Sequence, residues 1–166
     1  MKSIRTLLLI SGCISFVIVL GGAVYEHLNM VPRWKLAPPA SLTMFQGKYG
    51  IDAPRFWKLI HPIALSLMLA SLITNWKTAR RKYILSSVGA YVLVLIITFI
   101  YFVPELILIM QTPYQPVTDN GLVSRANTWE KLSLVRMVFI FGIAGILLFA
   151  LTKGNENKEP GPARLV

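Results

Sequence analysis

Residues 83–110 read YILSSVGAYVLVLIITFIYFVPELILIM, and Glu105 is the one charged side chain in this run. A helix rises 1.5 Å per residue, so as a helix the run would be about 42 Å long, more than the roughly 30 Å hydrocarbon core of a bilayer. Buried helices of soluble domains are rarely apolar over such a length. The run therefore predicts a transmembrane helix that is tilted or extends beyond the bilayer.

Three further apolar runs, residues 7–25, 56–73 and 134–151, are also long enough to cross the hydrocarbon. Backbone polar groups in lipid must be paired, and these runs lack the alternating pattern of a membrane β-barrel. We predict an all-α fold, an integral membrane four-helix bundle that forms one domain over residues 1–152. Residues 153–166 are polar and contain Gly and Pro, which predicts a disordered cytoplasmic tail.

The composition is also typical of a membrane protein. Hydrophobic residues make up 55% of the 166 residues and charged residues 14%, against about 45–50% and about 25% in soluble domains. The net charge is +10, but the basic residues lie between and beside the apolar runs, where they meet lipid headgroups. We therefore expect no nucleic-acid partner. The single cysteine, Cys13, excludes an intramolecular disulfide.

The short connection between the second and third spans holds a dense group of basic residues. They are Lys77, Arg80, Arg81 and Lys82. Basic residues in short loops favour the cytoplasmic side, so we expect both termini in the cytoplasm and a multi-pass protein of the cell membrane, of the bacterial inner-membrane type. Residues 10–13 resemble a lipoprotein cleavage box, but the apolar run continues past them, as in a retained span.

The two connections on the opposite side are rich in aromatic residues and proline. The first covers residues 26–55, and the second covers residues 111–128 with an Asp-Asn-Gly turn signal at residues 119–121. We expect these two extracytoplasmic loops to fold over the outer end of the bundle as a cap.

Each predicted span carries an ionisable side chain close to its outer end. Glu26 ends the first span, and His61, Glu105 and Arg136 lie about one turn inside the ends of the others. Such groups cost about 2.5–3.5 kcal/mol near the centre of a membrane helix, so each needs a partner or a function. Their common depth predicts a polar pocket near the outer membrane face, with Glu105, His61 and Arg136 as candidate catalytic residues.

Helical periodicity extends this set, because side chains three or four residues apart share a face. Tyr101 shares a face with Glu105, and Trp129 and Ser133 share one with Arg136. The candidate substrate-binding residues are Glu26, Trp57, Tyr101, Asn127, Trp129 and Ser133.

Structural alternatives stay open for the same residues. Glu105 and Arg136 are also compatible with an ion pair that locks the third and fourth spans together. His61, which precedes Pro62, is compatible with a helix start bonded to the first loop, and Glu26 with a solvated helix end. The four tryptophans are typical of aromatic belts at a bilayer surface.

A metal site built from Glu26, His27, His61 and Glu105 is a weaker hypothesis. No pair of these residues has the spacing that presents two ligands on one helix face. We predict no metal ligands, and the sequence leaves the cofactor unknown, with none firmly implied.

The pattern resembles a family of small four-span membrane proteins that includes the fungal anthrone oxygenases. The motifs that carry the resemblance are GGAVYE at 21–26, PRW at 32–34, PPASL at 38–42, FQGKY at 45–49, NW at 75–76, YFVPE at 101–105 and NTWEKLSLVR at 127–136. The resemblance covers residues 7–151 and implies, for some members, oxygenation of an anthrone to a quinone without an established cofactor. Many members carry a histidine at the position of Ser133, so only Asn127, Trp129 and Arg136 transfer as site candidates.

These observations lead to two hypotheses for the function. In the first, chemistry like that of an anthrone oxygenase, or an isomerase-like proton transfer, acts on a lipophilic phenol- or quinone-type molecule. Arg136 would hold its enolate oxygen, and Glu105 or His61 would move a proton. In the second, the protein is a non-enzymatic lipid- or quinone-binding subunit or scaffold. Membrane lipid and a lipophilic small molecule are the expected partners, and the sequence leaves the oligomeric state open.

Overall fold

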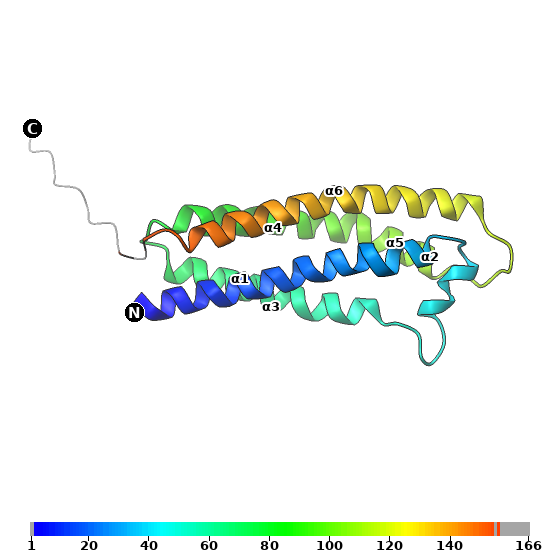
Figure 1. Cartoon of the computed structure of the whole chain (residues 1–166), viewed down its shortest axis with the longest axis horizontal. Helices are drawn as coiled ribbons and strands as arrows, with labels where there is room; N and C mark the ends of the chain where they lie inside the picture. The colour runs from blue at the N-terminus through cyan, green and yellow to red at the C-terminus, as the bar shows by residue number, and fades with distance from the viewer. Residues whose placement is uncertain (1, 155, 157–166) are drawn as a thin grey trace, which may run out of the picture.

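The fold is an antiparallel bundle of four long helical rods (Figure 1). The structure, a computed structural model, describes residues 2–154 and 156. Most of the predicted disordered tail lies outside the described residues. The four rods span Ser3–Trp34, Ala53–Thr74, Arg81–Met110 and Asn120–Ala150, and each is long and apolar enough to cross a membrane. The predicted all-α, multi-pass architecture is therefore confirmed.

Two of the rods are not regular α-helices throughout. The first consists of α1 (Lys2–Tyr25), a π-helical turn η1 (Glu26–Met30) and α2 (Val31–Trp34). The third consists of α4 (Arg81–Ile97), a π-helical turn η3 (Thr98–Phe102) and α5 (Val103–Met110). The second rod is α3 (Ala53–Thr74), the fourth is α6 (Asn120–Ala150), and a 3₁₀ helix η2 (Ala40–Phe45) lies in the first long loop.

The fourth rod begins at Asn120, well before the predicted residue 134. Asp119 caps the helix, because its Oδ1 accepts hydrogen bonds from the backbone N–H groups of Gly121 at 2.7 Å and Leu122 at 3.1 Å. The expected Asp-Asn-Gly turn is thus the first turn of α6. The charges of its early turns lower the local hydropathy, but Ala126 and Trp129 are buried on one face, so this segment is an amphipathic helix.

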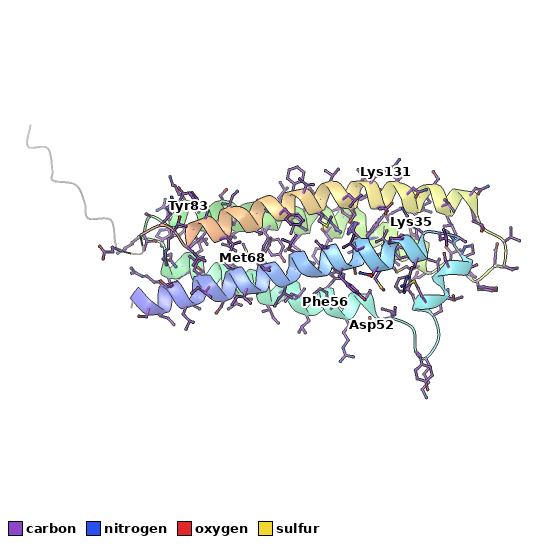
Figure 2. The ribbon with its side chains drawn as sticks, in the orientation of Figure 1. Lys35, Asp52, Phe56, Met68, Tyr83 and Lys131 are labelled. Carbon is purple, nitrogen blue, oxygen red and sulfur yellow. The ribbon has the colours of Figure 1, made fainter. Side chains whose placement is uncertain are left out.

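The bundle has two ends, which differ in structure. The basic end contains residues 2–6, 75–81 and 150–153, with Tyr83 beside it (Figure 2). The capped end contains the loops of residues 35–52 and 111–119, close to Lys35 (Figure 2). The first of these loops packs against the helices through η2. Leu42 of η2 is fully buried, and the Asp119 backbone N–H donates to the Pro38 carbonyl at 2.9 Å.

Two separate apolar cores hold these ends. The membrane core lies between α1, α3, α4 and α6, around Phe16, Met68, Tyr91 and Leu147. The cap core is built by η2 and by the helices that flank the two loops. Its buried members are Val31, Trp34, Leu42, Phe102, Ile109, Ala126 and Trp129. The aromatic-belt interpretation is therefore wrong for two tryptophans, because Trp34 and Trp129 are only 2% and 3% exposed.

A buried arginine closes the basic end. The Arg80 guanidinium donates to the Lys153 carbonyl at 2.9 Å, to Thr6 Oγ1 at 3.0 Å and to the Leu151 carbonyl at 3.4 Å. It thereby ties the loop after α3 to the start of α1 and to carbonyls at the C-terminus of α6, where a cation is favoured. Burial lowers the pKa of this guanidinium below its usual value. Arg80 is thus a structural residue rather than a free surface cation.

Candidate functional site

A group of seven interacting side chains lies where the two cores meet, and one of them, Tyr91, also belongs to the membrane core. We call it the polar cluster, and it consists of Glu26, Trp57, His61, Tyr91, Thr98, Ser133 and Arg136. A hydrocarbon layer that starts at the basic end and spans about 20 residues of each rod would reach positions near 25, 55, 101 and 131. Most of the cluster would then lie within the last turns on the hydrocarbon side of the capped end. All four rods contribute to it.

Arg136 is the cation of this cluster. Its guanidinium donates through Nη1 to Thr98 Oγ1 at 3.1 Å and through Nη2 to Ser133 Oγ at 2.8 Å. The guanidinium carbon lies 4.0 Å from the centroid of the Phe102 ring, a cation–π contact. Its Nε atom is buried and has no hydrogen-bond partner. The cluster therefore contains a fixed guanidinium with one nitrogen, Nε, that has no hydrogen-bond partner.

Glu26 and Trp57 join the first two rods. The Trp57 indole N–H donates to Glu26 Oε1 at 2.6 Å. The close approach depends on Gly22, because a Cβ at this position would lie 3.3 Å from Trp57 Cη2 and 2.5 Å from Phe56 Cε1. The Glu26 carboxylate lies within electrostatic range of the Arg136 guanidinium. Glu26 is therefore half-buried and partnered, and the alternative of a solvated helix end is wrong.

His61 joins the second and third rods. A hydrogen bond of 2.7 Å connects its Nδ1 to the Tyr91 hydroxyl, and its ring stacks on that of Trp57 at a centroid distance of 5.1 Å. The alternative of a helix-start residue bonded to the first loop is wrong, because α3 begins at Ala53, two turns earlier. The His61 ring is also within electrostatic range of Arg136. Tyr91 was not among the site residues predicted from the sequence.

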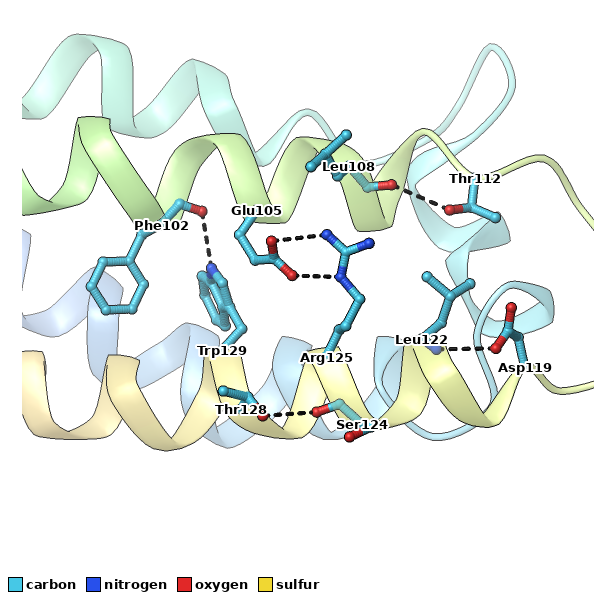
Figure 3. Close-up of polar contacts among 10 residues, drawn as sticks. All are labelled: Phe102, Glu105, Leu108, Thr112, Asp119, Leu122, Ser124, Arg125, Thr128 and Trp129. Carbon is cyan, nitrogen blue, oxygen red and sulfur yellow. Dashed lines mark hydrogen bonds and ion pairs between the residues drawn. The ribbon is translucent and has the colours of Figure 1, made fainter.

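Glu105 is not part of the polar cluster. Its two carboxylate oxygens accept from Arg125 Nε at 2.7 Å and Nη2 at 2.9 Å, a bidentate pair between α5 and α6 (Figure 3). The side chains of Glu105 and Arg125 are 20% and 45% exposed. The predicted ion pair between Glu105 and Arg136 is therefore wrong. A similar surface pair connects Lys35 to Glu130 of α6.

The remaining candidates lie on the capped side of the cluster. Trp129 belongs to the cap core, and its indole N–H donates to the Phe102 carbonyl at 3.0 Å (Figure 3). Tyr101 packs partly against the same core. Asn127 is half-buried, and no hydrogen bond within the described part of the chain involves its side chain. These three residues therefore lie outside the polar cluster. Of the predicted substrate-binding residues, the cluster contains Glu26, Trp57 and Ser133.

The described residues hold no group of three or more potential metal ligands. The four residues of the metal hypothesis are not assembled as a set. Glu105 is paired with Arg125, whereas His27 is bonded through Nδ1 to the Ala23 carbonyl at 2.8 Å and stacks on Trp129.

Both π-helical turns lie at the level of the polar cluster. Glu26 is the first residue of η1, and Thr98 is the first residue of η3. Each turn ends two residues before a proline, Pro32 or Pro104, which has no N–H to bond the carbonyl four residues earlier. Such π-turns occur often at functional sites. Here they turn Glu26 and Thr98 toward the same layer.

Comparisons of this chain with protein-family models, with curated proteins and with solved structures found no match.

Proposed function

We propose that the polar cluster binds the acidic oxygen of a lipophilic phenol-, enol- or quinone-type molecule that enters from the membrane. The observation that carries this proposal is the buried Arg136 Nε–H without a partner, beside two N–H groups held by hydroxyls. A guanidinium fixed in this way is suited to stabilise an oxyanion, because it needs little reorganisation as charge develops. An oxygen of the ligand would accept a hydrogen bond from the Arg136 Nε–H. It would also replace the hydroxyl of Ser133 or Thr98 as the acceptor for a neighbouring N–H group of the guanidinium.

The chemistry that fits this arrangement is proton abstraction next to a carbonyl. For an anthrone, a base removes a proton from the ring CH₂, Arg136 stabilises the resulting enolate oxygen, and dioxygen then oxidises the enolate, so that anthrone and O₂ give anthraquinone and water. Glu26 replaces Glu105 as the candidate carboxylate base, since Glu26 is within electrostatic range of Arg136 and Glu105 is paired elsewhere. His61 is the second candidate base.

The test uses the purified chain in lipid nanodiscs with an anthrone under air. Quinone absorbance and oxygen uptake are both recorded. We expect Arg136→Gln to lower turnover by roughly 10²–10³-fold, the usual loss when one oxyanion donor is removed. Arg125→Gln is the matched control, because it removes an arginine from the same helix outside the cluster, and it should retain turnover. Equal activity in the two variants would refute the proposal.

A specific observation favours the scaffold as the second candidate function. The bonds Trp57–Glu26, His61–Tyr91 and Arg136–Thr98 connect the four rods in series. If the cluster is only structural, Glu26→Gln and Arg136→Gln should each lower the melting temperature, with a double-mutant cycle showing coupling and no anthrone turnover in the wild type. If it is a site, the variants should lose turnover or ligand binding with melting temperatures close to that of the wild type.

The same proposal includes the location and orientation of the chain. We place it in the cell membrane with both termini in the cytoplasm, because the short basic loop favours that side. Cys13 is replaced by serine, and single cysteines are introduced at the exposed positions 48 and 77. A membrane-impermeant maleimide applied to intact cells should label position 48 and not position 77. The reverse labelling would contradict the orientation.

A further inference from the structure

We propose that the basic end carries a binding site for the phosphate group of an anionic phospholipid. An open cavity of about 400 Å³ lies there, beside the loop between α3 and α4. Among the described residues, its lining includes three cations and no carboxylate, and consists of Trp76, Lys77, Thr78, Ala79, Arg81 and Lys82. This site is independent of the polar cluster at the other end of the bundle.

The cations of this cavity are available to a ligand. Residues 77–82 contain four cations. Arg80 is already hydrogen-bonded within the bundle, whereas Lys77, Arg81 and Lys82 are exposed. Arg81 is stacked over the Trp76 ring, with 4.7 Å between its guanidinium carbon and the ring centroid. The stacking positions the guanidinium and leaves its N–H groups free for bidentate contact with a phosphate.

The loop that presents the cations is rigid. Thr78 Oγ1 donates to the Asn75 carbonyl at 2.9 Å and accepts from the Arg80 backbone N–H at 3.2 Å. The Asn75 side-chain amide donates to the Ser71 carbonyl at 2.9 Å. Because the loop is already ordered, binding costs little conformational entropy there. α4 also begins at this loop, and the positive end of its dipole adds to the attraction for an anion.

The surroundings of the cavity distinguish a lipid from free phosphate. Leu69 and Ile73 share one face of α3 and are 40% and 72% exposed, and Trp76, in the turn after α3, is 48% exposed. Leu85, one turn after Arg81 on α4, is 43% exposed. These side chains lie in or beside the membrane-spanning segments, so apolar surface for acyl chains adjoins the cations. A phospholipid can contact both surfaces at once, whereas inorganic phosphate contacts only the cations.

The experiment measures lipid retention by native mass spectrometry of the full chain in a neutral detergent. Phosphatidylglycerol and phosphatidylcholine with identical acyl chains are compared. The test variant is Lys77→Gln/Arg81→Gln/Lys82→Gln. The control variant, Arg33→Gln/Lys58→Gln/Lys131→Gln, removes the same one arginine and two lysines from exposed positions elsewhere.

We expect the wild type and the control variant to retain phosphatidylglycerol in preference to phosphatidylcholine. Each membrane-surface cation strengthens anionic lipid binding about fivefold, so the test variant should weaken it by on the order of 100-fold. Equal retention by the two variants, or an equal loss in both, would overturn the proposal. Inorganic phosphate at millimolar concentration should not displace the lipid. If phosphate alone binds as tightly, the lipid assignment is wrong.

Discussion

Replacing Arg80 with glutamine should destabilise the bundle far more than the same change at the neighbouring Arg81. The Arg80 guanidinium makes two short hydrogen bonds, to the Lys153 carbonyl and to Thr6 Oγ1, and a longer third one. A hydrogen bond to a charged group contributes about 1.5–3 kcal/mol, and glutamine can restore only part of this. We therefore expect Arg80→Gln to lower the free energy of unfolding by about 2–3 kcal/mol.

For a chain of this size that loss corresponds to a decrease in melting temperature of about 5–10 °C. Arg81→Gln removes an exposed cation–π contact with Trp76, which contributes about 0.5–1 kcal/mol, so its melting temperature should fall by about 2 °C. Both variants lose one positive charge at the start of α4, so the comparison isolates the buried hydrogen bonds.

The chain contains its own reporter for this measurement. Cys13 is the single cysteine, is 3% exposed, and lies against the Leu147 carbonyl at 3.7 Å. A fluorogenic maleimide reacts with it only when α1 separates from α6, so its reaction rate on heating in detergent gives the melting temperature. If Arg80→Gln and Arg81→Gln react at the same temperature, the three hydrogen bonds do not hold the basic end, and the reasoning fails.

Three further predictions follow from the capped end and the cluster. A double-mutant cycle on Glu105→Ala and Arg125→Ala should give a coupling energy of about 0.5–1 kcal/mol in thermal melts, because the pair is partly exposed; zero coupling would contradict the bidentate geometry. Leu42→Ala should cost about 2–4 kcal/mol locally and accelerate proteolysis of the first loop, whereas Leu36→Ala, at a position that is 78% exposed, should leave the cleavage rate unchanged. Tyr91→Phe should lower stability by about 1 kcal/mol and leave a more mobile imidazole in the cluster, visible as a broadened ¹⁵N-histidine NMR signal; an unchanged signal and melting temperature would argue against the hydroxyl contact.

The sequence predicted the four membrane-spanning rods because long apolar runs have few alternatives in a bilayer. It misplaced the start of α6, since Arg125, Glu130 and Lys131 hide an amphipathic helix from a hydropathy criterion. Periodicity analysis could have found this helix from its buried face.

The partner of Glu105 was not predictable from regular helical spacing. A regular α-helix places Thr98 and Glu105 on one face, seven residues apart. η3 begins at Thr98 and ends before Glu105. A π-turn holds one more residue than an α-turn, which rotates the residues beyond it by about 100°. Thr98 therefore faces Arg136, and Glu105 faces Arg125. Pro104 was the one sequence signal for this irregularity.

The separation of the two cores by a polar layer has a consequence for how the molecule opens. α6 contributes buried residues to both cores, and Ser133 and Arg136 lie on it between them. Because the polar layer interrupts the apolar packing, the two cores stabilise each other less than two parts of one continuous core would. The cap core should thus exchange its amide protons as one unit, ahead of the membrane core. Local melting of the cap would uncover the Arg136 guanidinium while the transmembrane half stays folded.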